Sequence, residues 1–261
     1  MRKIKDLFKR YHIIIMTSLG IAGVFLLWYI ISVIANTTLL PGPQVVVPLF
    51  FTLFADKDIY IAIGGTMGRL LLSVLAGTLL GIVFGLIGGL STSFRAFFRP
   101  FIVIFRTIPT AAIIYIIIAL LAPSIAPIII VFLIIFPKIY DAIVTGVDNV
   151  DKSIIEAAKV DGAKNLRLIF KIYLPLSKSY IILGLVSSIG LGMKVAIMSE
   201  ILAGNSSMIG LGKLIYIAST TVEMDCILAY SLIAIIIIGL VDIVIHFLKK
   251  KMNNGVSVKK K

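Results

Sequence analysis

Residues 156–175 read EAAKVDGAKNLRLIFKIYLP, a polar stretch rich in small residues that separates two long apolar segments. Almost all of the remaining chain is apolar enough to face hydrocarbon, so this loop carries most of the information about the kind of protein. Just upstream, Asp151 is a favourable N-cap, and Ser153 and Glu156 have the spacing of a capping box. These signals predict a helix over 152–161.

The same stretch contains the signals that end this helix and begin another one. Gly162 is placed to end the first helix in the left-handed conformation, where glycine costs least. Apolar residues at Leu166, Ile169 and Phe170 predict a second short helix, and Pro175 then restricts how the chain enters the next apolar segment. The sequence therefore predicts a compact helix–turn–helix between two membrane helices.

The composition excludes a soluble protein. Sixty per cent of the residues are hydrophobic, the mean hydropathy is +1.12, and only 14% of the residues are charged. A helix needs roughly 20 apolar residues to cross a bilayer, and the chain contains several such runs. The fold class that we expect is all-α integral membrane, with six spans at about 13–35, 62–90, 100–121, 126–147, 178–202 and 225–248.

The distribution of positive charge predicts the topology. The formal net charge is +13, and five basic residues lie in the first ten positions and six in the last thirteen. Basic clusters beside apolar helices mark cytoplasmic ends that contact anionic lipid, and no interleaved aromatic residues suggest nucleic acid. We expect a basic N-terminus (1–12), one membrane domain (13–248) and a basic tail (249–261), with both termini and the loop 148–177 on the cytoplasmic side of the bacterial inner membrane.

The second expected span contains four glycines in helical register. Gly77, Gly81, Gly85 and Gly89 recur every four residues, so they lie on one face of a helix. Glycine at this spacing lets two helix backbones approach closely in lipid. We expect this face to pack against another helix, and a glycine-lined pore is the alternative.

The loop resembles the EAA loop of ABC importer permeases, whose pattern is E-A-A-x3-G-x9-I-x-L-P. All seven defining positions are filled, by Glu156, Ala157, Ala158, Gly162, Ile172, Leu174 and Pro175. Over residues 36–248 the chain is similar to the nitrate/sulfonate/taurine type of binding-protein-dependent transport inner-membrane component. Further matches are Leu39-Leu40-Pro41, Arg106-Thr107-Ile108-Pro109, Lys194 to Glu200, and Gly210-Leu211-Gly212. This resemblance implies a type I ABC importer (MetI-like) fold and a homodimer.

The resemblance also implies partners. The permease would contact a separate pair of ABC ATPase subunits through the loop and receive solute from an extracytoplasmic binding protein. The residues expected at the ATPase contact are Glu156, Ala157, Ala158, Asp161, Gly162, Ile172, Leu174 and Pro175. No G-x-x-x-x-G-K-[ST] phosphate loop occurs in the chain, so ATP hydrolysis belongs to another polypeptide. We expect a non-catalytic subunit with no cofactor and no metal.

Ionisable side chains inside the spans are candidates for a translocation path, because they are expensive in a membrane and tend to face a cavity or a partner. Lys194 lies deep in span five, where it is expected either to attract an anionic or polar solute or to pair with a carboxylate on a neighbouring helix. Glu200 is about 9 Å further along the axis and points elsewhere, so a pair with Lys194 is not expected; gating and solvation are both open for it. Arg69 in span two and Pro109 in span three complete the candidates.

Two further pairs have helical spacing. Lys138 and Asp141 are three residues apart in span four, which predicts an ion pair near the cytoplasmic end. Asp242 and His246 are four apart in span six, which predicts a local pair.

Among the functions that a membrane protein of this kind can have, the permease subunit of an ATP-driven importer for a small anionic or polar solute fits best. The main alternative is an ion-coupled secondary transporter, which predicts inverted repeats with paired broken helices. A membrane enzyme would need clustered ligands or acids, whereas the chain has two histidines and one cysteine. A membrane anchor or sensor is the remaining class. Relatives of the resembling type transport nitrate, sulfonates, taurine, or pyrimidine and thiamine precursors, so the resemblance does not identify the solute.

Overall fold

The computed structural model describes residues 2–163, 165–204 and 208–257, and within these ranges the regular structure is entirely helical. Five of the described helices are long and apolar enough to cross a membrane, and a bent pair makes a sixth when it is counted as one span. This agrees with the predicted all-α, six-span fold. The helices are α1 (Arg2–Ala35), α2 (Pro43–Leu53), α3 (Lys57–Leu90), α4 (Thr92–Thr107), α5 (Thr110–Leu120), α6 (Ala126–Asp148), α7 (Lys152–Val160), α8 (Asn165–Leu168), the π-helix η1 (Ile169–Tyr173), α9 (Leu174–Leu202), α10 (Leu211–Thr220) and α11 (Met224–Ser257).

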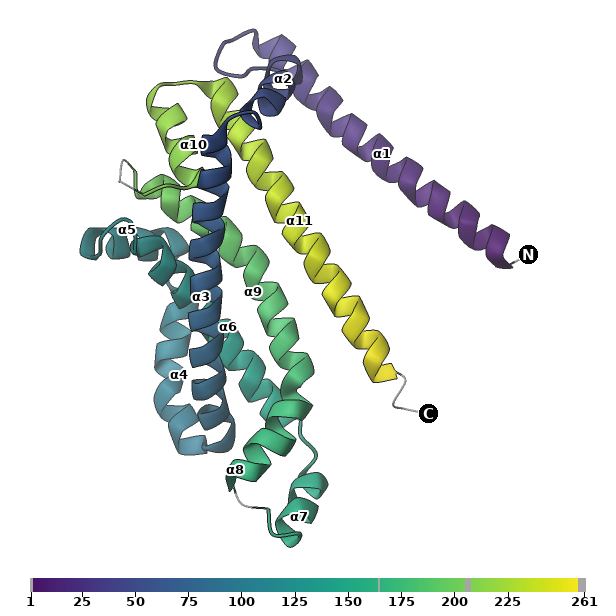
Figure 1. Ribbon diagram of the computed structural model, residues 1–261, viewed down its shortest axis with the longest axis vertical. Helices are drawn as coiled ribbons and strands as arrows, with labels where there is room; N and C mark the ends of the chain where they lie inside the picture. The colour runs from purple at the N-terminus through teal and green to yellow at the C-terminus, as the bar shows by residue number, and fades with distance from the viewer. Residues whose placement is uncertain (1, 164, 205–207, 258–261) are drawn as a thin grey trace.

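Helices α3, α6 and α9 form the centre of the bundle (Figure 1). The four glycines of α3 lie against α6. A Cβ atom built on each glycine would meet a side chain of α6, and these side chains also recur every four residues. At Gly81, for example, a Cβ atom would lie 2.6 Å from the Cγ2 atom of Ile139. The predicted packing face is confirmed. The facing pairs are Gly77 with Ile135, Gly81 with Ile139, Gly85 with Ile143 and Gly89 with Val147.

Span three is not the single helix predicted over 100–121. Helices α4 and α5 meet at a bend of 99°. The break has a local cause: Pro109 has no N–H group and forces the preceding residue out of the helical region, and Ile108 is extended, with φ −64° and ψ 130°. The predicted loop over 91–99 is also wrong, because Ser91 caps α4, which is helical from its first turn.

The chain on either side of span five is more helical than predicted. Helix α8, the π-helix η1 and α9 follow one another without a break, so the apolar segment that could cross the membrane begins at Leu166 rather than near residue 178. Beyond it, α10 forms in the segment 203–224, for which only a connection was expected. Helix α11 continues to Ser257, into the expected tail. The predicted partner of Asp242, His246, lies outside the described side chains.

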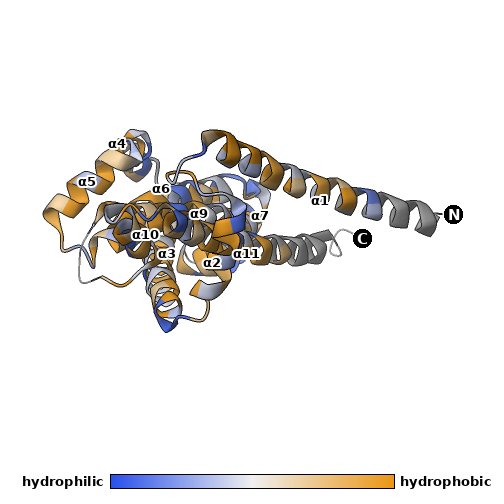
Figure 2. Ribbon diagram, turned by 90° about the horizontal axis from the view of Figure 1, so that it is seen from above, coloured by the Kyte–Doolittle hydropathy of each residue, from blue (hydrophilic) through white to orange (hydrophobic). Residues whose placement is uncertain are grey.

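Helix α1 diverges from the bundle, and its exposed surface is apolar along most of its length (Figures 1 and 2). In its apolar stretch, Ile15–Ala35, Ser32 is the one buried residue. Its C-terminal part is held by two hydrogen bonds: the Trp28 Nε1–H group donates to the Pro41 carbonyl (3.2 Å) and the Ser32 hydroxyl donates to the Leu40 carbonyl (2.8 Å). The apolar sides of α1 are therefore available to lipid or to another chain.

Candidate functional site

The segment from Asp151 to Tyr173, which we call the knob, projects from the lower end of the bundle in Figure 1. Its first helix, α7, is capped by the Asp151 carboxylate, which accepts a hydrogen bond from the Ser153 N–H group at 2.9 Å. This backbone hydrogen bond lowers the pKa of Asp151, because it stabilises the charged form. The predicted N-cap and helix are confirmed.

The turn after α7 has the geometry of a Schellman motif. Gly162 has φ +77°, and its N–H group donates to the Lys159 carbonyl at 3.0 Å, while the Ala163 N–H group donates to the Ala158 carbonyl at 2.9 Å. A Cβ atom on Gly162 would meet nothing within 4 Å. Glycine is therefore required there by the left-handed backbone and not by lack of space.

Large apolar side chains are exposed on the surface of the knob. Val160 is 86% exposed, Leu166 70% and Phe170 65%. Exposed apolar groups that are surrounded by polar residues mark surfaces where other molecules bind. Of the residues expected at an ATPase contact, Glu156, Ala157, Asp161, Gly162 and Pro175 are exposed, and Ala158, Ile172 and Leu174 are half-buried.

Arg95 joins three helix ends next to the knob. Its guanidinium group donates to both oxygens of Asp148, at 3.0 and 2.8 Å, where α6 ends. It also donates to the carbonyls of Gly88 (2.8 Å) and Gly89 (3.2 Å) at the end of α3. The ends of α3 and α6 and the start of α4 are thereby fixed to one another. Sequence reasoning missed this group, because its members are distant in the chain.

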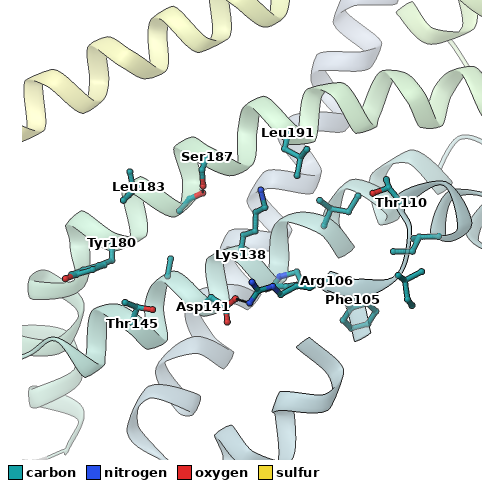
Figure 3. Close-up of a pocket in the computed structure, with 16 residues that line it drawn as sticks. Phe105, Arg106, Thr110, Lys138, Asp141, Thr145, Tyr180, Leu183, Ser187 and Leu191 are labelled. Carbon is teal, nitrogen blue, oxygen red and sulfur yellow. Dashed lines mark hydrogen bonds and ion pairs between the residues drawn. The ribbon is translucent and has the colours of Figure 1, made fainter. Parts of the chain in front are cut away.

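A cavity of about 540 Å³, with apolar and polar lining residues, lies between the α4–α5 break, α6 and α9 (Figure 3). Three charged side chains line it, Arg106, Lys138 and Asp141. An ion pair closes part of its wall, since the Arg106 Nη1 atom lies 2.6 Å from the Asp141 Oδ2 atom. Hydroxyl groups supply the other polar side chains of the wall, those of Thr110, Thr145, Tyr180 and Ser187.

The predicted ion pair between Lys138 and Asp141 is wrong. Asp141 pairs across to Arg106 instead, on the helix that ends at the break. Lys138 forms no ion pair within the described part of the chain. Figure 3 shows its side chain extending toward α9, between Ser187 and Leu191.

Two of the predicted pathway residues border the cavity without lining it. Lys194 is exposed on α9 and follows Leu191, a lining residue, by one helical turn. The structure contains no ion pair of Lys194 among its described residues, so the expected alternative of a neighbouring carboxylate is not found. Pro109 lies in the helix break between two lining residues, Ile108 and Thr110.

The other two, Arg69 and Glu200, form a buried cluster away from the cavity. Glu200 is 0% exposed, so the expected alternative of solvation is wrong. One of its carboxylate oxygens accepts from the Arg69 Nε (2.9 Å) and Nη2 (2.5 Å) atoms. The other oxygen accepts from the Thr66 hydroxyl (2.8 Å) and the Gly212 N–H group (2.9 Å). A buried carboxylate is tolerated only with such full pairing.

This cluster holds the start of α10 against α3 and α9. Arg69 also donates to the Ile209 carbonyl at 2.6 Å, and the Thr66 hydroxyl accepts from the Leu211 N–H group at 2.9 Å. The contact is close because the turn contains glycine: a Cβ atom on Gly212 would lie 2.5 Å from the Ile197 carbonyl oxygen. A gating role for Glu200 and a place for Arg69 on the translocation path stay predictions.

Comparison with known proteins identifies the family. The model of the family described as "Binding-protein-dependent transport system inner membrane component" matches residues 77–257, which is more than half of the chain. The chain belongs to this family of inner-membrane transport components.

Individual relatives agree with this assignment. A putative ABC transporter permease protein of Methanocaldococcus jannaschii is 33% identical over 102 residues, which are 39% of this chain and 36% of that protein, so the chain spans about a third of that relative's length. A solved structure of the MetNI methionine ABC transporter in an inward-facing conformation has a TM-score of 0.64 and 14% identity, over 74% of this chain and 95% of that one. A bacterial alginate ABC transporter in complex with an alginate pentasaccharide-bound periplasmic protein has a TM-score of 0.67 and 18% identity, over 96% and 97%. At these identities the solved structures support the fold alone.

Proposed function

We propose that this permease forms the membrane path for a small anionic or polar solute and is driven by a separate ATPase that binds the knob. Two copies of the chain would enclose the path, and an extracytoplasmic binding protein would deliver the solute at the end where α2 and α10 lie. The knob and both termini would face the cytoplasm. The observation that carries this proposal is the knob, a rigidly capped structure with exposed apolar side chains at one end of the bundle.

The construction of the knob supports a mechanical role. Its first helix is fixed at both ends, by Asp151 and by the turn at Gly162. Its second part continues through η1 into α9 without a loop. At its base, Arg95 and Asp148 join α3, α4 and α6. A push on the knob would therefore reach several membrane helices, including three that line the cavity, α4, α6 and α9.

The cavity supports a path for a polar solute. It combines charged and hydroxyl side chains with apolar walls at a helix break, which is the kind of place where membrane proteins bind polar solutes. The exposed side of α9 extends beyond the cavity to Lys194. Closing of the ATPases would switch access to this cavity from one side of the membrane to the other, as a two-state element that both ATP and solute bias.

Co-expression with the ATPase, purification and reconstitution test the proposal. Glu156→Lys reverses the charge on the exposed side of α7 with a side chain of similar length. We expect it to reduce ATPase binding or to separate ATP hydrolysis from solute uptake, while the chain still inserts in the membrane. The matched control is Asp58→Lys, the same charge reversal on the first turn of α3 at the other end of the molecule.

The control variant should bind the ATPase as the unaltered chain does. If Glu156→Lys binds and transports as well as Asp58→Lys, the knob is not the ATPase contact. Uptake that follows an ion gradient with no hydrolysis would instead support a secondary transporter.

A further inference from the structure

The charges of the cavity do not cancel. Arg106 and Asp141 neutralise each other at 2.6 Å, and the remaining polar side chains of the wall are uncharged hydroxyls. Lys138 is the one charged lining residue without an ion pair among the described residues. Because the end of α4 and the start of α5 both border the cavity, their opposite helix dipoles offset each other. The net field in the cavity therefore comes from the Lys138 ammonium group.

The position of Lys138 makes this charge costly. It lies near the middle of α6, at least about 15 Å from either helix end at 1.5 Å per residue. An extended lysine side chain is too short to bring its ammonium group to the membrane surface from there. The side chain is half-buried and extends toward Ser187 and Leu191 of α9 (Figure 3). A charge held inside a membrane protein in this way marks a functional position.

We propose that Lys138 makes the cavity selective for anions and that its ammonium group binds an oxyanion of the transported solute, such as a carboxylate, sulfonate or phosphate. The proposal rests on the cavity being the transport path. Ser187 lies on the facing helix α9 beside the Lys138 side chain (Figure 3). Its hydroxyl donates to the Gly184 carbonyl at 2.9 Å and would turn toward a bound oxyanion. The Arg106–Asp141 pair forms a neutral wall beside it and does not set the sign of the field.

The test measures the electrostatic potential in the cavity and needs no knowledge of the solute. Ser187→Cys is introduced into the full chain with Cys226→Ser, which leaves a single thiol, and the protein is reconstituted in vesicles. The rates of reaction with a negatively and a positively charged methanethiosulfonate reagent are then compared. With Lys138 present, the negative reagent should react faster. Lys138→Gln should lower the ratio of the two rates by about 5- to 30-fold, as expected for removing a nearby unit charge from a partly screened site.

Two controls make the result specific. The double variant Arg106→Gln/Asp141→Asn removes two charges of opposite sign, so the ratio should stay within about twofold of its starting value. Lys178→Gln removes a positive charge from α9 outside the cavity lining and should leave the ratio unchanged. The same measurements at Thr145→Cys give a second position in the wall.

The proposal is overturned if Lys138→Gln leaves the ratio unchanged, or if Lys178→Gln lowers it equally. It is also overturned if neither cysteine reacts, because the cavity would then be closed to aqueous solutes. The thiol reaction requires no ATPase. If Lys138→Gln leaves the ratio of the two rates unchanged while ATP-driven uptake is observed, the anion site is refuted and the proposed function stands. If the ratio falls as expected but the complex shows no ATP-driven uptake, the proposed function is refuted instead.

Discussion

Replacing Arg69 by Met leaves the Glu200 carboxylate buried without its cation. Glu200 is fully buried and accepts four hydrogen bonds, two of them from Arg69. Removing one partner of a buried ion pair costs about 3–5 kcal/mol, because the remaining charge is uncompensated. Replacing both charges, in Arg69→Met/Glu200→Leu, removes that penalty. The double variant should therefore be about 1–3 kcal/mol more stable than the sum of the two single effects implies.

Two measurements follow this change in the purified full chain. Denaturant unfolding gives the free energies of the single and double variants. Hydrogen exchange reports on α10 directly, because the amides of Leu211 and Gly212 donate to Thr66 and Glu200. In Arg69→Met these two amides should exchange at least about tenfold faster, which corresponds to 1.4 kcal/mol. Exchange at Ser153, in the knob, is the internal control and should not change.

Additive effects of the two single replacements would refute the reasoning, because independent sites do not share a penalty. So would a loss of less than about 1 kcal/mol in Arg69→Met with unchanged exchange at the start of α10. In either case the cluster would not be what holds α10 in place.

Three other predictions concern the helix interface and the knob. Gly81→Ala should destabilise the chain by about 1–3 kcal/mol through overpacking against Ile139. Adding Ile139→Ala should recover part of this loss, because it makes room for the new methyl group. Gly68→Ala on the same helix, where a Cβ atom meets nothing within 4 Å, should be neutral or stabilising in the same unfolding assay. Gly162→Val should strain the left-handed turn by about 1–2 kcal/mol and weaken co-purification with the ATPase, without affecting membrane insertion. Gly162→Asn is the control, because asparagine tolerates this backbone conformation, and it should still bind the ATPase. Equal ATPase binding by the two variants would contradict the role of the turn. Because the pKa of Asp151 is lowered in the folded chain, its capping contribution is present at neutral pH and is lost as the pH falls below about 4. Amide exchange in α7 should therefore become faster at low pH. In Asp151→Asn, which caps the helix without a charge, exchange should not show this dependence on pH.

Features that depend on local sequence were predictable. The spacing of the α3 glycines predicted a packing face, because every fourth residue of a helix lies on one side, and α6 has side chains at the same interval. The knob was predictable because an N-cap and a glycine C-cap satisfy backbone groups a few residues away. The membrane spans followed from hydropathy, except where a chain break intervenes.

Features that depend on distant partners were not predictable. Glu200 pairs with Arg69, which is 131 positions away in the chain. Helical spacing relates only residues a few positions apart, so it could not identify this partner. Asp141 had a candidate one turn away in Lys138, but the bend at Pro109 brings Arg106 to it instead. The X-Pro pair at 108–109 did contain a signal for the break, which the apolar character of the whole segment obscured.

Solute accumulation in vesicles tests the central claim most directly, since that claim assigns the energy source to another polypeptide. The purified permease would be reconstituted with its binding protein, in one preparation with the ATPase and in another without it. The account predicts accumulation against a gradient only when the ATPase and hydrolysable ATP are both present. Accumulation by the permease without the ATPase, driven by an ion gradient, would contradict it.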